Sequence, residues 1–422
     1  MDTAFPDGIA RPLLVGLSGG LDSTVLLHLL AHSPLRTNGF RAIHVHHGLH
    51  SDADAWAAHC EAACAALGVP LSIARVDVVD TGDGPEASAR ATRHAAFERE
   101  LRDGEILALA HHRDDQAETF LLRALRGSGV DGLGAMRPWR VFGRGWLWRP
   151  LLAQPREALR DYATAHGLRW IEDPSNADER FDRNFLRNRV MPLLRERWPR
   201  ADAAFARSSA LSAEAADALA QIDDASFGAL VDGDTLSTEA LRVLPADARA
   251  RLLRRWTQRL DLPPLPADSL RRIQSELLPA ADDRVPHYDW RDARIVRWRG
   301  RLHAFRRDGE WPVDWQRDWD GSEPLALPDG TSLALEGTPR FDATVQVRTR
   351  MGGERIVLPG RTHSHALKHV LQERGTPPWE RARLPLLFAA DGSLQAAGAD
   401  ILAAPFAEWL ATRHARLRRR LA

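Results

Sequence analysis

The sequence predicts an α/β fold: an open, Rossmann-like parallel sheet with helices on both faces, followed by a helical domain and a small α+β domain. Residues 11–152 alternate short apolar runs with amphipathic stretches of helical length, which is typical of a parallel sheet with right-handed crossovers. The first apolar run ends in a glycine turn that leads directly into a helix. Sheets of this class bind ligands at the carboxyl ends of their strands, so this turn marks the expected site.

The elements of this first region follow from apolar spacing and from helix start and stop signals. Helix 51–67 is expected to begin with Ser51 as its N-cap, and helix 155–166 to begin with Pro155 and end before Gly167. The expected strands are residues 12–17, 41–46, 71–76, 105–110 and 146–151, and the expected helices are 23–32, 51–67, 85–101, 114–126 and 155–166.

Length and texture predict three domains, over residues 1–200, 201–318 and 319–422. Residues 203–277 are rich in Ala, Leu and Arg at helical spacing, which indicates a helical middle domain. Beyond residue 319, short alternating runs at 332–335 and 345–348 indicate strands, and a helix is expected at 363–374.

Composition narrows the class of protein. The chain is 44% apolar and 27% charged, as in ordinary globular proteins. No apolar stretch approaches the ~20 residues that span a bilayer, so no membrane partner is expected. Cys60 and Cys64 form no disulfide framework, which favours a cytoplasmic location and simple packing roles. Arginines gather in residues 180–200 and 413–420, where they form either solvated faces or a phosphate-backbone footprint.

The segment from Ser18 to Thr24 is the most specific signal in the chain. Two glycines allow close backbone approach to a ligand, and the following helix start favours an anion. Asp22 would repel a phosphate unless a cation lies between them, so the loop is interpreted as a cradle for Mg²⁺-pyrophosphate. Its members are Ser18, Gly19, Gly20, Leu21, Asp22, Ser23 and Thr24.

Two other phosphate loops are excluded. A Walker A loop needs a lysine at a fixed position, and the only lysine of the chain is Lys368. The G-x-G-x-x-G match at residues 127–132 follows a helix instead of a strand, so it is expected to be a flexible loop. The S-G-G-x-D-S loop resembles that of the N-type ATP pyrophosphatases, or PP-loop ATPases, which cleave ATP between the α and β phosphates.

Polar clusters follow the second and fourth expected strands as well, and all converge on one edge of the sheet. His46 and His47 end the second strand and are expected to contact a nucleobase; without spaced ligand pairs, zinc is not expected. Asp115 and Glu118 share one face of the helix after the fourth strand and need a cation, either a metal or an amine. Arg90 is either a surface arginine or a group that steadies the α-phosphate.

Taken together, these motifs resemble the tRNA(Ile)-lysidine synthetase family over nearly the whole chain. The combination is more specific than the first loop alone, especially the tail of the first domain and a downstream Pro-Pro-Trp element. The matching pieces are residues 18–24, 43–49, 86–90, 112–119, 126–129, 169–176, 182–187 and 375–381. Two positions depart from the family pattern, His94 and the Gly84-Pro85 pair, which puts the helix start and the base-side wall in doubt.

The resemblance implies an enzyme that uses ATP to adenylate the C2 oxygen of the wobble cytidine in a minor tRNA(Ile) with a CAU anticodon. The amine of free L-lysine then displaces AMP to give lysidine. By resemblance, Asp22 holds Mg²⁺, Arg90 lies beside the α-phosphate, and Asp115 with Glu118 holds lysine. The expected tRNA contacts are Arg183, Arg187, Arg189, Lys368 and Arg381.

Two alternatives remain at this point. A tRNA 2-thiolation enzyme of the same fold would need a reactive cysteine, which mid-helix Cys60 and Cys64 do not supply. A non-catalytic nucleotide- or RNA-binding protein would gain nothing from Asp22 in its anion loop. The sequence leaves open the oligomeric state, with a homodimer as one alternative. It also leaves open the number of metal ions, the base that deprotonates lysine and the discrimination against tRNA(Met).

Overall fold

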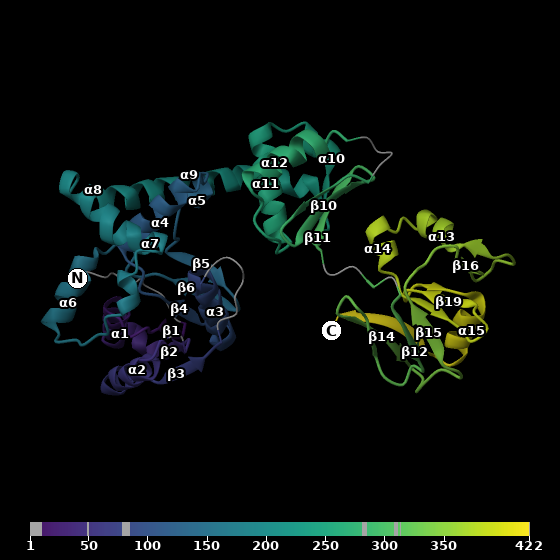
Figure 1. The fold of residues 1–422 in the computed structure, drawn as a ribbon, viewed down its shortest axis with the longest axis horizontal. Coiled ribbons are helices and arrows are strands. Elements are labelled where there is room, and N and C mark those ends of the chain that lie inside the picture. Colours follow the sequence, from purple (N-terminus) through teal and green to yellow (C-terminus); the bar gives the residue numbers. More distant parts are fainter. Residues whose placement is uncertain are drawn as a thin grey trace. The chain divides into compact units, whose positions relative to one another are not determined.

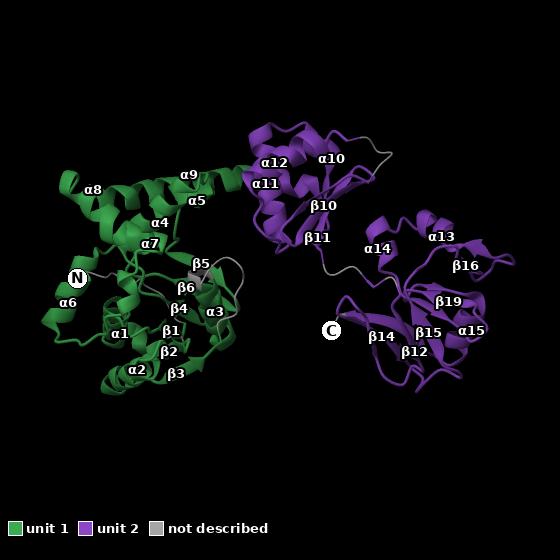
Figure 2. Ribbon diagram, in the orientation of Figure 1, with its two compact units in different colours: residues 1–222 green, residues 223–422 purple. Residues whose placement is uncertain are grey.

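A computed structural model describes residues 11–48, 50–77, 85–280, 285–307, 311–312 and 314–421. The chain divides into two compact units, Met1–Ile222 and Asp223–Ala422 (Figure 2). Among the described residues, no helix is long and apolar enough to cross a membrane.

Unit 1 is built on a six-stranded sheet in the order β3-β2-β1-β4-β6-β5 (Figure 1). All neighbouring strands are parallel except β5 and β6, which form an antiparallel hairpin. The predicted open parallel sheet is therefore confirmed, whereas the edge strand β5 was missed. The strands are β1 (Leu13–Gly16), β2 (Phe40–His46), β3 (Leu71–Arg75), β4 (Ile106–Ala108), β5 (Trp139–Phe142) and β6 (Gly145–Trp148).

Helices cover both faces of this sheet, as predicted. Along β1, Leu13 and Val15 belong to one hydrophobic core, and the intervening Leu14 belongs to a second core on the opposite face. This alternation follows from the two-residue period of a strand. The helices are α1 (Leu21–Ala31), α2 (Ala53–Leu67), α3 (Pro85–Glu100), α4 (Arg113–Leu125), α5 (Val130–Leu133) and α6 (Arg156–Ala165), with a 3-10 turn, η1, at Pro34–Asn38.

The start of α2 differs from the prediction. The N-cap is Asp52, not Ser51, and its side chain makes no capping hydrogen bond. The Ser51 hydroxyl instead lies 3.4 Å from Asp52 Oδ1. Because a capping residue must have its oxygen within reach of the first-turn N–H groups, a serine one residue too early cannot cap the helix.

Several short helices and one long helix follow the sheet, and the short helix α7 packs against α4 (Figure 1). One turn of π-helix, η3, lies among these helices, where the chain is irregular between two α-helical stretches. The elements are η2 (Pro174–Ala177), α7 (Asp182–Phe185), η3 (Leu186–Val190), α8 (Met191–Arg197) and the long α9 (Ala201–Leu230).

The first half of unit 2 contains the helices expected for the middle of the chain, together with a five-stranded sheet that the helical spacing did not reveal. Helices and sheet share one core around the fully buried Trp256. The helices are α10 (Thr238–Arg242), α11 (Ala246–Arg259), α12 (Ala267–Arg272) and η4 (Ile273–Leu277); the strands are β7 (Val231–Asp232), β8 (Thr235–Ser237), β9 (His287–Trp290), β10 (Ala293–Trp298) and β11 (Arg301–Arg306).

The second half of unit 2 is an α+β arrangement with a separate core, which includes Leu333 and Val347 from the two strands that were predicted. Trp379 joins the two halves, because its ring stacks on Phe305 with centroids 5.5 Å apart. The helices are α13 (Leu367–Glu373), α14 (Pro378–Ala382) and α15 (Ala404–Thr412), and the strands are β12 (Gln316–Trp319), β13 (Leu325–Ala326), β14 (Thr331–Glu336), β15 (Val345–Arg348), β16 (Arg355–Ile356), β17 (His365–Ala366), β18 (Leu386–Phe388), β19 (Leu394–Ala397), β20 (Ile401–Leu402) and β21 (Arg416–Leu421).

Candidate active site

The glycine turn after β1 requires glycine at one position in particular. Gly19 has φ +84°, and a Cβ there would lie 2.8 Å from Ile171 Cδ1 and 3.1 Å from Cys60 Sγ. The Ile171 N–H also donates to the Gly19 carbonyl over 2.9 Å. The turn is therefore held between α2 and the segment after α6, and a larger residue would displace it.

Hydroxyl groups inside the turn fix its shape. Ser23 Oγ donates to the Gly20 carbonyl over 3.0 Å and accepts from the Ser18 N–H over 3.2 Å. Gly20 is the N-cap of α1 in extended conformation and makes no side-chain cap, so N–H groups of the first turn stay available at the sheet edge. This is the geometry that favours an anion.

Asp22 stands in the first turn of α1 with one oxygen unsatisfied. Its Oδ1 is buried and has no hydrogen-bond partner among the described residues. Its Oδ2 lies 3.6 Å from His112 Nε2, and Arg156 Nε lies 3.8 Å from Oδ1. A carboxylate oxygen buried without a donor is costly, so the site fits a bound cation such as Mg²⁺.

The helix after β4 begins with a reciprocal cap between His112 and Asp115. The Asp115 N–H donates to His112 Nδ1 over 3.3 Å, and the His112 N–H donates to Asp115 Oδ2 over 3.0 Å. Burial lowers the pKa of His112, but the carboxylates of Asp22, Asp115 and Asp114 outweigh it, so that the pKa is raised. His112 thereby links the start of α4 to the turn Ser18–Thr24 after the neighbouring strand, which we call the pyrophosphate loop after its predicted ligand.

Asp115 and Glu118 share one helix face, as predicted, and both meet guanidinium groups. Arg183 Nη2 lies 2.9 Å from Asp115 Oδ1, and its Nε lies 2.9 Å from Glu118 Oε2. Arg187 Nη2 lies 3.0 Å from Asp115 Oδ1, and its Nε lies 2.7 Å from Glu118 Oε1. Burial opposes ionisation of Asp115, yet these cations and His112 hold its pKa well below the usual range.

The structure places two of the arginines that were predicted to bind tRNA, Arg183 and Arg187, against carboxylates of the same unit. The side chains of Arg183 and Arg187 are only 21% and 26% exposed and lie against the acidic pair. They stand four residues apart across α7 and η3, so both project toward α4. We call these four residues, Asp115, Glu118, Arg183 and Arg187, the acid–arginine cluster.

The other predicted site residues in unit 1 lie around the same edge. Arg90 on α3 is partly buried, and its charge acts on His94 and His111. His46 is engaged, with Nε2 3.2 Å from Asp54 Oδ1, whereas the buried Nδ1 of His47 has no partner among the described residues. The predicted contact of these two histidines with a base therefore stays a prediction.

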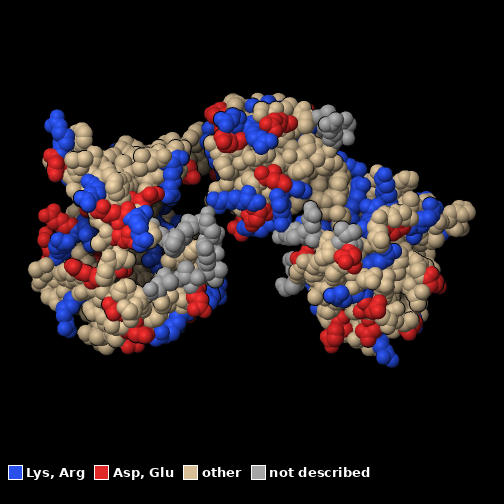
Figure 3. Space-filling view, in the orientation of Figure 1, with Lys and Arg blue, Asp and Glu red and all other residues tan. Residues whose placement is uncertain are grey.

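The remaining residues predicted to bind tRNA are spread over both units. Arg189 is exposed and paired with Glu179 over 2.8 Å. Lys368 on α13 is exposed, and Arg381 on α14 is partly buried and donates to the Thr376 carbonyl. Basic side chains gather near α14 (Figure 3). The arginines near residue 420 are partly neutralised, since Arg418 lies 3.2 Å from Glu336.

Sequence reasoning missed Arg149 at this edge, and it placed His111 at the end of the fourth expected strand without naming it among the site residues. Arg149 follows β6 directly and is only 5% exposed, and its Nε donates to His111 Nδ1 over 3.3 Å. The signal was available, because both residues closely follow apolar strand segments whose ends pair in the sheet at Ala108 and Trp148.

The two cysteines do not form a reactive site. Burial raises the pKa of Cys60 to about 12 and that of Cys64 to about 11. Their thiols are therefore protonated at neutral pH, and Cys60 packs beneath the pyrophosphate loop beside His44. Among the described residues, no group of three or more His, Cys, Asp or Glu side chains could hold a metal ion by itself, and the expected absence of zinc stays a prediction.

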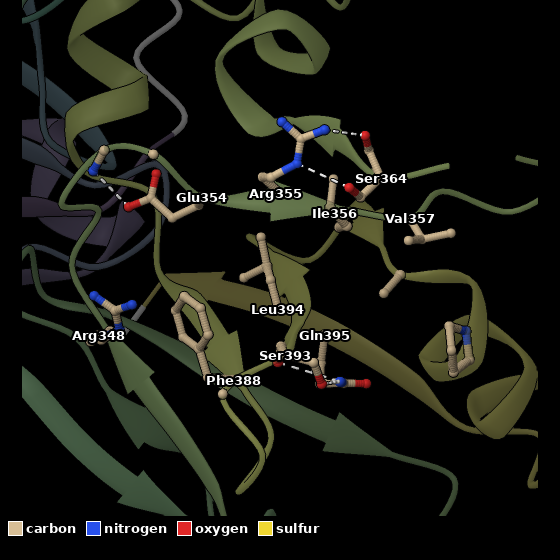
Figure 4. A pocket seen from close by; sticks show the side chains of 15 residues that line it. Arg348, Glu354, Arg355, Ile356, Val357, Ser364, Phe388, Ser393, Leu394 and Gln395 are labelled. Carbon is tan, nitrogen blue, oxygen red and sulfur yellow. Dashed lines mark hydrogen bonds between the residues drawn. The ribbon is translucent and has the colours of Figure 1, made fainter. Parts of the chain in front are cut away.

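A hollow of about 470 Å³ lies in the second half of unit 2 and shares no residue with the acid–arginine cluster. Figure 4 shows Arg348 beside Phe388 on one side and Arg355 bonded to Ser364 on the other. Its charged lining residues are Arg348, Arg355 and Glu354.

Three family models match successive parts of the chain. The PP-loop domain family matches residues 3–194, the TilS substrate binding domain matches residues 236–303, and the TilS substrate C-terminal domain matches residues 345–418. Among solved structures, a TILS C-terminal domain is 22% identical and covers 26% of this chain and 97% of that chain, with a TM-score of 0.21.

Curated relatives match over nearly the full length. The chain is 53% identical to the tRNA(Ile)-lysidine synthase of Xanthomonas campestris pv. campestris (strain 8004), over 97% of this chain and 95% of that protein. It is 42% identical to the enzyme of the same name from Methylococcus capsulatus, over 95% and 92%. The corresponding enzyme of Shigella flexneri is 43% identical, over 92% of each chain. Because these relatives share 42–53% of their residues with the chain over nearly its whole length, the chain belongs to the tRNA(Ile)-lysidine synthase family.

Proposed function

We infer that this protein ligates L-lysine to C2 of the wobble cytidine in the CAU anticodon of a minor tRNA(Ile), at the expense of ATP. The observation that supports this most directly is the link between Asp22 and the helix that carries Asp115, through His112 Nε2 at 3.6 Å and 3.3 Å. The residues of the proposed phosphate cradle and of the proposed lysine site follow the paired strands β1 and β4, which supports a shared site. A thiolation enzyme is not favoured, because the cysteines are buried and protonated.

The reaction divides into two transfers. The C2 oxygen of cytidine attacks the α-phosphorus of ATP, so that a C2–O–P bond forms and pyrophosphate leaves. The lysine ε-nitrogen then attacks C2, and the C2–O bond breaks with AMP as the leaving group. The ε-ammonium, with a reference pKa near 10.4, must lose its proton before it attacks.

In this proposal the Ser18–Thr24 turn and the start of α1 hold the β and γ phosphates through backbone N–H groups and hydroxyls. Asp22 is the residue that would hold Mg²⁺, which when bound neutralises phosphate charge. Arg90 would lie beside the α-phosphate and steady the charge that shifts as pyrophosphate departs.

We propose the acid–arginine cluster as the lysine site. Its two carboxylates and two guanidiniums balance one another, and an amino acid head likewise carries one ammonium and one carboxylate. The head of lysine can enter without adding a net buried charge if its α-ammonium contacts Asp115 and Glu118 while its α-carboxylate contacts an arginine. Arg183 and Arg187 then serve tRNA binding only indirectly.

The tRNA itself would be held mainly through phosphates, by Arg189 in unit 1 and by Lys368 and Arg381 in unit 2. Phosphate contacts position the RNA without reading its sequence, so discrimination from tRNA(Met) must come from other contacts. A homodimer and a cytoplasmic location remain predictions from the sequence.

The test uses the full-length protein with ATP, Mg²⁺, radiolabelled lysine and purified candidate tRNAs. We expect label in one isoleucine tRNA only, with one AMP and one pyrophosphate released per lysine. Omission of lysine should leave an adenylated tRNA and pyrophosphate release. Sulfur incorporation in place of lysine, or ATP hydrolysis without label, would overturn the assignment.

A further inference from the structure

Arg149 is a buried arginine without a carboxylate partner. It is 5% exposed, and among the described residues no acidic side chain lies within ion-pair distance of it. The charged groups that act on it are all cations: Arg140 on β5, Arg90 on α3 and Arg123 on α4. Burial, followed by these cations, lowers the pKa of Arg149 to about 10. Because a buried unpaired charge is costly, the arrangement calls for a function.

The hydrogen bonds of Arg149 are few and specific. Its Nη1 donates to the Arg137 carbonyl over 2.7 Å, and its Nε donates to His111 Nδ1 over 3.3 Å. The first bond anchors the guanidinium on the β5 side of the sheet edge. The second reaches across to the loop between β4 and α4.

A guanidinium can donate hydrogen bonds but cannot accept them. The Nδ1 of His111 must therefore act as an acceptor, and the proton of the neutral ring must be on Nε2. A second proton on Nδ1 would face the guanidinium N–H, so the imidazolium form is excluded as long as the bond persists. Among the described residues, no hydrogen-bond partner of His111 Nε2 is found, which leaves this N–H as a donor.

The surroundings of His111 agree with this interpretation. Burial lowers the pKa of His111 well below its ordinary value, Asp115 on α4 raises it, and Arg149, Arg183 on α7 and Arg90 on α3 lower it again. His111 stands four residues before Asp115 and one before His112, so it belongs to the edge that holds the acid–arginine cluster.

We propose that Arg149 is a positioning residue that fixes His111 as the neutral Nε2–H tautomer and so provides a hydrogen-bond donor at the site of ligation. This inference rests on the proposed function, because it assumes that the chemistry takes place at this edge. Arg149 itself is not assigned a contact with substrate.

The first experiment reads the tautomer in the resting enzyme, without any dependence on activity. Nitrogen-15 NMR of the imidazole-labelled full chain, with the His111 signal assigned by its loss in His111→Asn, should show a neutral ring with the proton on Nε2. That signal should not titrate near pH 6.5, where an ordinary histidine protonates. A ring protonated at Nδ1, or one that titrates normally, overturns the proposal even if lysidine synthesis is confirmed.

The second experiment is a double-mutant cycle in the lysidine assay. Arg149→Met should lower kcat by about 10- to 100-fold, the value of one buried hydrogen bond, and add an acid limb to the pH–rate profile. Arg149→Lys, which keeps a donor, should recover part of the rate. The exposed Arg140→Met is the control, since it removes a neighbouring charge without touching His111.

In a His111→Ala background, Arg149→Met should cause little further loss. If the two effects instead multiply, or if Arg149→Met raises the KM for ATP with kcat unchanged, Arg149 acts directly on a substrate and the proposal is wrong. Should Arg149→Met fail to fold, the NMR signal of the unmodified enzyme still decides.

Discussion

The first prediction concerns Asp22 and depends on one of its carboxylate oxygens, Oδ1. Its buried Oδ1 has no protein donor among the described residues, so the carboxylate is set up to meet a cation. Asp22→Asn should lower pyrophosphate release by about 100-fold or more, because loss of the cation contact removes several kcal/mol of transition-state stabilisation. Binding of tRNA, measured by filter retention, should change little. Normal pyrophosphate release would remove Asp22 from the mechanism.

Glu118 tests the lysine site. Glu118→Gln leaves Arg183 and Arg187 with only Asp115 as a counter-charge, and removal of one partner from such a buried ion-pair group costs about 3–5 kcal/mol. We expect a lower urea midpoint and a KM for lysine raised about 10-fold or more, with adenylation of tRNA much less affected.

Asp114→Asn is the matched control for Glu118→Gln, since Asp114 is on the same helix but contacts none of the four cluster residues. Its carboxylate accepts from the Arg156 N–H over 3.1 Å and lies 3.4 Å from Arg195 Nη2 and 3.8 Å from His112 Nδ1. It should lose about 0.3–1 kcal/mol of helix-dipole stabilisation and keep its lysine dependence. An equal KM change in both variants would mean that the acidic pair does not bind lysine.

At the scale of elements, the turn between β1 and α1 keeps its shape only while position 19 has no side chain, because Ile171 and Cys60 lie against it. Gly19→Ala forces a Cβ against Ile171 and adds strain at φ +84°. We expect the KM for ATP to rise by at least about 10-fold as the turn shifts. Gly127→Ala has φ +69° but nothing within 4 Å of the added carbon, so it carries only the conformational cost. Equal ATP affinities of the two variants would show that the turn does not hold the nucleotide.

The two cysteines of helix α2 allow a test that distinguishes a ligase from a thiolation enzyme. With thiol pKa values of about 12 and 11, Cys60 and Cys64 should resist iodoacetamide at pH 8 in the folded protein and react only after denaturation. Mass spectrometry counts the modified thiols. Rapid modification of Cys60, with loss of activity, would reopen the thiolation alternative.

The sequence predicted the elements whose signals are local. Alternation of apolar strands and helices sufficed for the parallel sheet, and S-G-G-x-D-S sufficed for the loop after β1. Three features escaped because they depend on partners distant in sequence. The edge strand β5 has β6 as its only neighbour in the described sheet. Arg183 and Arg187 counted as free basic residues until the fold brought α4 against them. Arg149 fell inside the expected strand 146–151, whereas β6 ends at Trp148 and leaves Arg149 at the sheet edge.

For the whole molecule, the prediction concerns tRNA binding by unit 2. Removal of one side chain that binds a phosphate should reduce the slope of log K against log salt by about 1. Lys368→Gln should therefore weaken tRNA binding at low salt and flatten this slope, as measured by fluorescence anisotropy over a salt series. Arg144→Gln is the control, because this exposed residue precedes β6 at the amino edge of the sheet. An unchanged slope for Lys368→Gln would exclude that contact.

The larger organisation was predictable only in part. Helical spacing indicated the middle of the chain as helical, but the sheet β7-β8-β11-β10-β9 is assembled from strands on either side of those helices. Its strands are short or follow turns, so each is too weak a signal alone. The downstream α+β texture was visible because β14 and β15 alternate clearly.

The chain, for which free lysine is the proposed substrate, contains a single lysine of its own, exposed on α13. Apart from the α-amino group, an amine-reactive fluorophore can label this protein only at Lys368, in the part of the chain that is predicted to bind tRNA. A dye attached to Lys368 would report tRNA binding in real time without an engineered cysteine. Reductive methylation with a labelled methyl group would give an NMR probe at the same side chain.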